Sequence, residues 1–361
     1  MQGALLPDWI EATVALLILI AFTYTQFRHI GLALAAALAP LPGYGVAIAL
    51  HMPSQPLAYL CGFFVALVLS SEIEARICDG VSARAASKQT AEMSFPILVW
   101  PIALTVCAPA VLLFVANDFS PLAFSLAVGL CGASALIVVP AALRFLPYGE
   151  EFIARANRLR EKRERWLDGL AFVVQPRWGW SVGGIALIFA ILGFSGGENS
   201  GAEWPFASPA ASPMLAALFA IFAYVTTRNM RRAAAFLLAV AVLACLTFWI
   251  CGRIAFDAGS LPLAIALASG PALIVAGQAT AFAQAGDNVA VATLRSLEQL
   301  ATPVAFFCLA GVPVLCIFGA FGAAMLIASG GIAALVVFPA LTTAIYDLLP
   351  PRVSLDAYRV R

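Results

Sequence analysis

The sequence predicts an all-α polytopic membrane protein with about eleven transmembrane helices, an external N-terminus and a cytoplasmic C-terminus. Three observations support this class: the composition, the positions of the basic residues, and a segment that occurs twice. Of the 361 residues, 63% are hydrophobic and only 11% are charged, and the mean hydropathy is +0.97. Soluble domains carry about 25% charged residues, so this composition is that of an integral membrane protein.

Long apolar runs follow one another along the whole chain. The length of most runs is close to the length of about 20 residues that a helix needs to cross a bilayer. They are too long and too uniformly apolar for the strands of a closed barrel. Each run therefore predicts a transmembrane helix. In order, the runs cover 10–27, 30–50, 57–74, 95–116, 121–145, 178–195, 212–227, 233–250, 260–282, 301–319 and 322–345.

The basic residues lie almost entirely on one side of these predicted spans. Of the 20 Lys and Arg residues, all but Arg253 follow an odd-numbered run. Because loops rich in Lys and Arg stay in the cytoplasm, we expect the N-terminus outside and the C-terminus inside. The opening "MQGALLPDWIEA" lacks a basic start and carries Asp8 and Glu11, so we expect no secretory signal peptide.

The longest predicted cytoplasmic loop, 147–177, contains "EEFIARANRLREKRERWLDGLAF". Its apolar residues recur near the helical period, and basic residues occupy the other positions. This pattern predicts a basic amphipathic helix lying on the inner leaflet, with a solvated linker helix as the alternative. The candidate membrane-surface residues are Arg155, Arg158, Arg160, Lys162, Arg163 and Arg165.

The segment "ALIVVPAALRFLP" at 135–147 returns as "ALVVFPALTTAIYDLLP" at 334–350. Three more pairs align in the same order: 25–41 with 226–242, 56–75 with 262–281, and 95–106 with 302–315. Each copy holds five helices and starts on the same side of the membrane, which predicts a parallel repeat. The expected domains are a first repeat at 1–146, the basic linker at 147–177, a linking helix with a short periplasmic loop at 178–211, and a second repeat with a cytoplasmic tail at 212–361.

At these helix ends the chain resembles the membrane domain of the resistance-nodulation-division (RND) superfamily, nearest to its MMPL and hopanoid-lipid exporter branch. The resemblance rests on Val138-Val139-Pro140-Ala141 and on Val337-Phe338-Pro339-Ala340-Leu341. In that family the last helix of each half ends in an apolar run, Pro-Ala-Leu and a cytoplasmic exit. The resemblance implies a multi-pass protein of the bacterial inner membrane that exports a hydrophobic molecule.

The chain departs from the family in two ways. A periplasmic porter domain should follow the linking helix, but "SGGENSGAEWPFASPAASP" at 195–213 is a short loop, and the first half lacks its leading helix and porter domain. The MMPL branch also has a Gly-x-x-x-Asp-Tyr element in the fourth helix of each half, and neither equivalent helix contains Asp-Tyr. The proton relay of the family therefore has no matching residue here.

Intramembrane polar residues are the remaining candidates for a transport site, because such residues are costly in a bilayer. Glu72 and Glu74 are candidate displaced proton carriers, or ordinary residues at a helix end, where Glu72 would pair with Arg76. Gln278 lines a pathway or joins two helices by a hydrogen bond. The full set is Ser70, Ser71, Glu72, Glu74, Gln278 and Gln284.

No motif points to a cofactor, a metal site, nucleic acid binding or an enzymatic reaction. The eight cysteines form no Cys-x-x-Cys pair, and His29 and His51 are the only histidines. Two functions stay open. The first is a transporter component that moves a hydrophobic, lipid-like molecule. The second is a degenerate pseudo-transporter that acts as a scaffold for a separate periplasmic porter-like protein, a lipid enzyme or a second copy of the chain.

Overall fold

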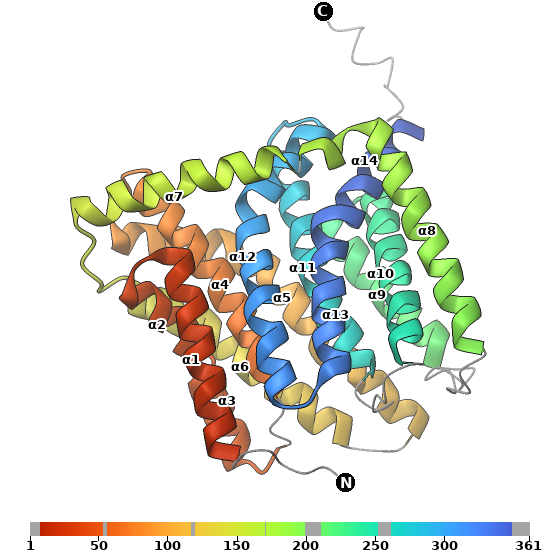
Figure 1. Cartoon of the computed structure of the whole chain (residues 1–361), viewed down its shortest axis with the longest axis horizontal. Coiled ribbons are helices and arrows are strands. Elements are labelled where there is room, and N and C mark those ends of the chain that lie inside the picture. The colour runs from red at the N-terminus through yellow and green to blue at the C-terminus, as the bar shows by residue number, and fades with distance from the viewer. Residues whose placement is uncertain are drawn as a thin grey trace, which may run out of the picture.

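The computed structural model describes residues 8–52, 56–116, 120–169, 171–198, 211–251 and 261–348, and these form a bundle of helices with no strand among them (Figure 1). The predicted periplasmic loop after the linking helix, the loop that carries Arg253, and the C-terminal tail lie outside the described residues.

The first half of the bundle has six helices. They are α1 (Asp8–Phe27), α2 (Ile30–Leu38), α3 (Leu41–Ala49), α4 (Pro56–Cys78), α5 (Ala83–Ala116) and α6 (Ser120–Leu143). A linker follows with α7 (Glu150–Asp168) and the short helix η1 (Ala171–Val174). The remainder comprises α8 (Pro176–Glu198), α9 (Ala211–Thr227), α10 (Met230–Cys251), α11 (Leu261–Gln284), α12 (Val289–Ile317), α13 (Phe321–Ile332), the π-helical turn η3 (Ala333–Val337) and α14 (Phe338–Leu348).

Helices occupy every predicted span, and eight candidate spans in the described residues are long and apolar enough to cross a membrane. Three predicted boundaries were wrong. The second span is broken at Ala39 and Pro40 into α2 and α3, because Pro40 has no N–H for a continuous helix. Helices α5 and α12 begin at Ala83 and Val289, well before their apolar runs, because polar residues extend them.

The same turn joins the first two helices of each repeat. Arg28 and Arg228 both have a positive φ, of 51° and 45°, and each N–H donates to the carbonyl oxygen of the tyrosine four residues earlier. His29 and Asn229 follow, and each accepts a backbone N–H with its side chain at the start of the next helix. The two copies thus match at an offset of 200 residues, one less than the alignment of 25–41 with 226–242 assumed.

A close helix crossing also occurs twice. A Cβ added at Gly62 of α4 would lie 2.6 Å from the carbonyl oxygen of Cys131 on α6, and one added at Gly330 of α13 would lie 2.2 Å from that of Ala268 on α11. Gly62 aligns with Ala268, and Cys131 aligns with Gly330. The glycine at the crossing therefore lies on α4 in the first half and on α13 in the second half, although the crossing itself is the same.

Helices α4 and α11 are the most enclosed spans, with 78% and 89% of their apolar windows buried. Helix α4 packs on α6 and α12, and α11 packs on α13 and α5. At the flanks, α1 packs on α12 as α9 packs on α5. Helices α4, α5, α11 and α12 therefore form the centre, where the two halves meet.

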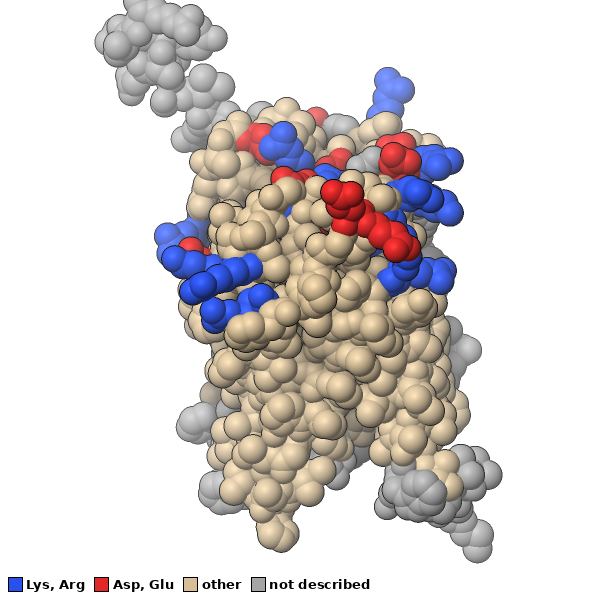
Figure 2. Space-filling view, turned by 90° about the vertical axis from the view of Figure 1, so that its left-hand side faces the viewer, with Lys and Arg blue, Asp and Glu red and all other residues tan. Residues whose placement is uncertain are grey.

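Charged residues gather at one end of the molecule. Helix α7 lies across that end of the bundle (Figure 1), and on the face shown in Figure 2 the Lys, Arg, Asp and Glu side chains lie toward the same end, while the remaining described surface is free of them. This is the end that the basic residues predict to be cytoplasmic.

Candidate functional site

Four polar side chains meet at the centre of the bundle, one from each central helix. They are Glu72 of α4, Ser94 of α5, Gln278 of α11 and Gln299 of α12, and we call them the central polar cluster. The Glu72 carboxylate accepts a hydrogen bond from the Ser94 hydroxyl through Oε2 and from Gln278 Nε2 at 3.5 Å through Oε1. Gln278 Nε2 also lies 2.5 Å from Gln299 Oε1. Hydrogen bonds thus link both halves at this point.

The local sequence explains how these residues come together. Glu72 and Gln278 occupy the same position in the aligned segments 56–75 and 262–281. The predicted repeat therefore pairs the two positions that the structure joins by a hydrogen bond. Gly277 assists, because a Cβ there would lie 3.0 Å from a methyl carbon of Thr226 on α9, so the missing side chain lets the neighbouring helix approach.

The expected ion pair of Glu72 with Arg76 is not present. The Arg76 guanidinium donates instead to Gln89 Oε1 at 3.2 Å and contacts the Met93 sulfur. The hydrogen-bond partners of Glu72 in the described residues are therefore neutral. A carboxylate with neutral partners in an apolar bundle is costly and is commonly functional.

Burial changes steeply across the cluster. Ser94 and Gln278 are 3% and 8% exposed, Glu72 is half-buried, and Gln299 is exposed. One turn before Ser94 on the same side of α5, the Thr90 hydroxyl is buried without a hydrogen-bond partner. The cluster thus runs from the molecular surface into the centre of the bundle.

The chemistry of this arrangement is that of a proton-binding carboxyl group. An ionised carboxylate only accepts hydrogen bonds, whereas a protonated carboxyl must donate one. Proton uptake by Glu72 would turn one of its two oxygens into a donor, so that its hydrogen bond with Ser94 or its hydrogen bond with Gln278 would have to rearrange. The hydrogen bond from Gln278 to Glu72 is thus one contact between the halves that can respond to the protonation state of Glu72.

A second polar group joins the linker to the bundle. Arg163 of α7 lies 3.2 Å from the Glu74 carboxylate and also donates to the carbonyl oxygen of Gln26 at the end of α1. The Glu74 side chain is only 4% exposed, and its other oxygen and the Gln26 amide have no hydrogen-bond partner. We call Glu74 and Arg163 the linker ion pair; it holds α7 on α4.

The other predicted intramembrane residues do not join the cluster. Ser70 is fully buried, and its hydroxyl has no partner; Ser71 is half-buried. Gln284, a candidate intramembrane residue, is the last residue of α11 and is exposed. The polar residue of α11 that reaches the centre is Gln278.

The linker helix differs from the expectation in its buried side. Phe152 and Ala156 are 8% and 4% exposed because they face the bundle, and the Phe152 ring lies 5.0 Å from that of His29. These apolar residues of α7 therefore pack on the protein, not in the inner leaflet. Arg163 also points inward, and Arg160 pairs with Asp79 at 3.0 Å. The outward-facing residues of the predicted basic set are Arg155, Arg158, Lys162 and Arg165.

The sequence reasoning missed Ser94 and Gln299. Both precede the apolar runs of their helices, in stretches taken as cytoplasmic turns. The signal that could have found them is the spacing of polar residues by three or four positions, which places them on one side of a helix. That spacing is visible in Ser87, Thr90 and Ser94 of α5 and in Thr293, Ser296 and Gln299 of α12.

Two solved structures of SecDF are similar to this chain. SecDF from Thermus thermophilus, a translocon-associated membrane protein, is 14% identical, with a TM-score of 0.62 over 93% of this chain. SecDF in its super-membrane-facing form is 13% identical, with a TM-score of 0.59 over 97% of this chain. At these identities the similarity shows a shared fold, so the chain has the fold of the matched part of SecDF.

The chain spans 62% of the length of each SecDF chain. No protein-family model matches the sequence, and no curated protein matches it. The comparisons therefore show a fold shared with SecDF, and membership of the RND superfamily and of its MMPL and hopanoid-lipid branch stays a proposal.

Proposed function

We propose that the chain is an RND-type transport component of the bacterial inner membrane in which Glu72 takes up and releases protons. The observation that carries the proposal is the Glu72 carboxylate, which lies at the junction of the two halves with neutral hydrogen-bond partners. Its protonation turns one carboxylate oxygen from an acceptor into a donor, which alters the hydrogen bond with Ser94 or the hydrogen bond with Gln278. Proton movement is thereby coupled to the contact between the halves, which is the element that alternating access needs.

The molecule moved, in this proposal, is hydrophobic and lipid-like. Two features support it. Most buried residues of the bundle are apolar, and Glu74 and Arg232 are the charged residues among those buried in the described chain. Such an interior has few groups to stabilise a charged or strongly polar substrate.

Proton flux through proteoliposomes tests this function. The purified chain is reconstituted with a trapped pH-sensitive dye, and a potassium diffusion potential drives proton entry. We expect flux with the wild type and background flux with Glu72→Gln, which keeps the size and one acceptor oxygen but cannot titrate. The matched control is Glu92→Gln, because Glu92 is an exposed acid of α5 that pairs with Lys88. Wild-type flux in the Glu72 variant would overturn the assignment.

The alternative function is a partner subunit that holds another protein in the membrane. It is favoured by the similarity to SecDF, a translocon-associated protein, over only 62% of the SecDF chain. A pull-down in gentle detergent with mass spectrometry of proteins and lipids separates the two. A stoichiometric periplasmic partner together with absent proton flux would favour the partner subunit; a chain that emerges alone with an enriched lipid and conducts protons would favour the carrier.

A further inference from the structure

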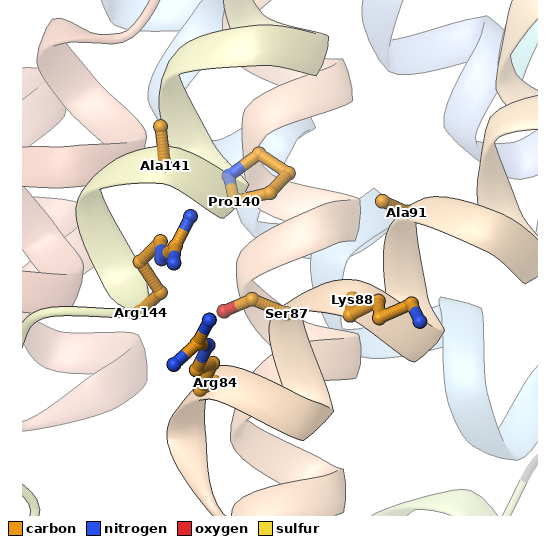
Figure 3. A pocket seen from close by; sticks show the side chains of 7 residues that line it. All are labelled: Arg84, Ser87, Lys88, Ala91, Pro140, Ala141 and Arg144. Atoms are coloured by element: carbon orange, nitrogen blue, oxygen red, sulfur yellow. The ribbon is translucent and has the colours of Figure 1, made fainter.

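A pocket of about 410 Å³ lies between α5 and α6 at the charged end of the molecule (Figure 3). It is distinct from the central polar cluster. Its lining residues are Arg84, Ser87, Lys88, Ala91, Pro140, Ala141 and Arg144. The space exists because small side chains face each other here, and because Pro140, within α6, has no N–H to close its helical turn.

The charge of this pocket is positive. The guanidinium groups of Arg84 and Arg144 lie on the same side of it (Figure 3), and neither forms an ion pair among the described residues. Arg144 contacts the Phe145 ring, with 4.9 Å between the guanidinium carbon and the ring centroid. Lys88 points away from both arginines (Figure 3) and pairs with Glu92 at 3.8 Å. Two arginines are thus available to an anion.

Ser87 is a second, independent sign of a ligand. It is only 3% exposed, and its hydroxyl is buried without a hydrogen-bond partner. The hydroxyl oxygen points toward the arginine side of the pocket (Figure 3). Because buried polar groups are normally hydrogen-bonded, an unpartnered hydroxyl beside two guanidinium groups indicates a missing acceptor.

We propose that this pocket binds the phosphate group of an anionic phospholipid from the cytoplasmic leaflet. Phosphate oxygens accept from arginine in a bidentate manner and from a serine hydroxyl, and basic pockets between transmembrane helices on the cytoplasmic side suit lipid headgroups. The binding does not depend on the transport function proposed above.

The surface beside the pocket favours a lipid over free phosphate. Ile137 lies one turn from Ala141 on the same side of α6 and is 70% exposed, and Phe95 lies one turn from Ala91 on α5 and is 49% exposed. These apolar side chains continue from the pocket into the part of the bundle that faces the bilayer. Acyl chains attached to the bound phosphate would lie against them.

Lipid titration of the purified full chain tests the proposal. Thermal stabilisation is followed in detergent with short-chain phosphatidylglycerol, with short-chain phosphatidylcholine, and with inorganic phosphate. We expect stabilisation by phosphatidylglycerol, and at least about tenfold weaker apparent affinity in the double variant Arg84→Gln with Arg144→Gln. The matched control is Arg158→Gln with Arg165→Gln on α7, which removes the same charge from an exposed surface and should leave the affinity unchanged.

Three outcomes would overturn the site. Equal loss in both double variants would mean that general charge attraction, and not the pocket, holds the lipid. Full stabilisation by inorganic phosphate at equal concentration would mean that the ligand is free phosphate. Should the double variant unfold, Ser87→Ala removes a single oxygen; we expect it to weaken phosphatidylglycerol binding several-fold, and an unchanged affinity would exclude the pocket.

Discussion

At the residue scale, the linker ion pair is the interaction whose loss we expect to cost most. Removing Arg163 leaves the Glu74 carboxylate buried without a counter-charge, whereas removing Glu74 leaves an arginine that is partly exposed and can turn to water. Breaking a buried pair costs about 3–5 kcal/mol. Because Arg163 is partly exposed, we expect Arg163→Gln to lower the free energy of unfolding by about 2–4 kcal/mol, and Glu74→Gln to lower it by less. Denaturant unfolding in mixed micelles measures both.

Arg158→Gln is the control for this pair, because Arg158 is exposed on the same helix. Substitutions of exposed residues usually change the free energy of unfolding by no more than about 0.5 kcal/mol. The double variant of Glu74 and Arg163 should recover part of the loss, since no charge then remains unpaired. Equal and additive losses in the two single variants would contradict the pairing.

His29 gives the folded protein a dependence on pH. It accepts a hydrogen bond from Leu32 N through Nδ1 at 3.3 Å and stacks against Tyr148 and Phe152 of the linker. Burial, and then the positive charge of Arg155, lower the pKa of His29 below its ordinary 6.5. As the pH falls below 6.5, the unfolded chain therefore takes up a proton at this position before the folded chain does.

The stability of the protein should consequently fall as the pH drops from the ordinary pKa of histidine toward the lower pKa of folded His29. We expect His29→Asn to reduce this dependence, because asparagine still caps the helix and does not titrate; Asn229 already occupies the equivalent position of the second repeat. Melting temperatures between pH 7 and pH 5 measure the effect. The same pH slope in the variant and the wild type would exclude His29 as its source.

Part of the candidate site was predictable at this scale. Glu72 and Gln278 stand out in the sequence as polar residues in apolar helices, and the repeat alignment already pairs them. Their contact was not predictable, because the sequence suggests that Glu72 pairs with Arg76. In the structure Arg76 donates to Gln89 instead. The inward direction of Arg163 was not predictable either, because Arg163 lies among other basic residues that the sequence predicts to be exposed. Its partner Glu74 is identified only by the structure.

At the element scale, glycine is required at positions where two helices cross so closely that a Cβ atom would overlap with the neighbouring backbone. In the short helix α3, a Cβ at Gly43 would lie 2.2 Å from the carbonyl oxygen of Leu130 on α6, while a Cβ at Gly45 meets nothing within 4 Å. We expect Gly43→Ala to destabilise by about 1–3 kcal/mol through overpacking. Gly45→Ala should be neutral or should stabilise by up to about 1 kcal/mol, because alanine favours the helix. Thermal unfolding of the two variants compares them directly.

The two alanine variants differ by two positions in one helix, so their contrast isolates the crossing from helix propensity. If both variants melt together with the wild type, α3 does not pack closely on α6. Sequence periodicity could not supply this distinction, because both glycines lie in one apolar run. It also joined α2 and α3 into one span, since apolarity continues unbroken through Ala39 and Pro40 while the backbone does not.

At the scale of the whole molecule, the two halves repeat their contacts more faithfully than their residues. The turn at Arg28 recurs at Arg228, and the crossing at Gly62 recurs with its glycine on the other helix at Gly330. A duplicated arrangement that tolerates such exchange indicates that helix geometry, and not a particular side chain, is what both copies preserve. The apolar segments of the sequence predict the duplication, whereas the exchanged glycine is visible only in the structure.

The membrane orientation is the prediction that belongs to the whole chain. Helix α7 and the other basic segments lie at one end of the bundle, and carrying so many Lys and Arg residues across the membrane is unfavourable, so that end should face the cytoplasm. We expect an impermeant maleimide to label Leu50→Cys, at the end of α3, in intact spheroplasts. Lys162→Cys on α7 should react only after permeabilisation. Both positions are exposed, and the wild type gives the background because seven of its eight cysteines are buried or half-buried. The reverse labelling pattern would place α7 outside, and would remove the cytoplasmic leaflet as the source of the lipid proposed for the pocket between α5 and α6.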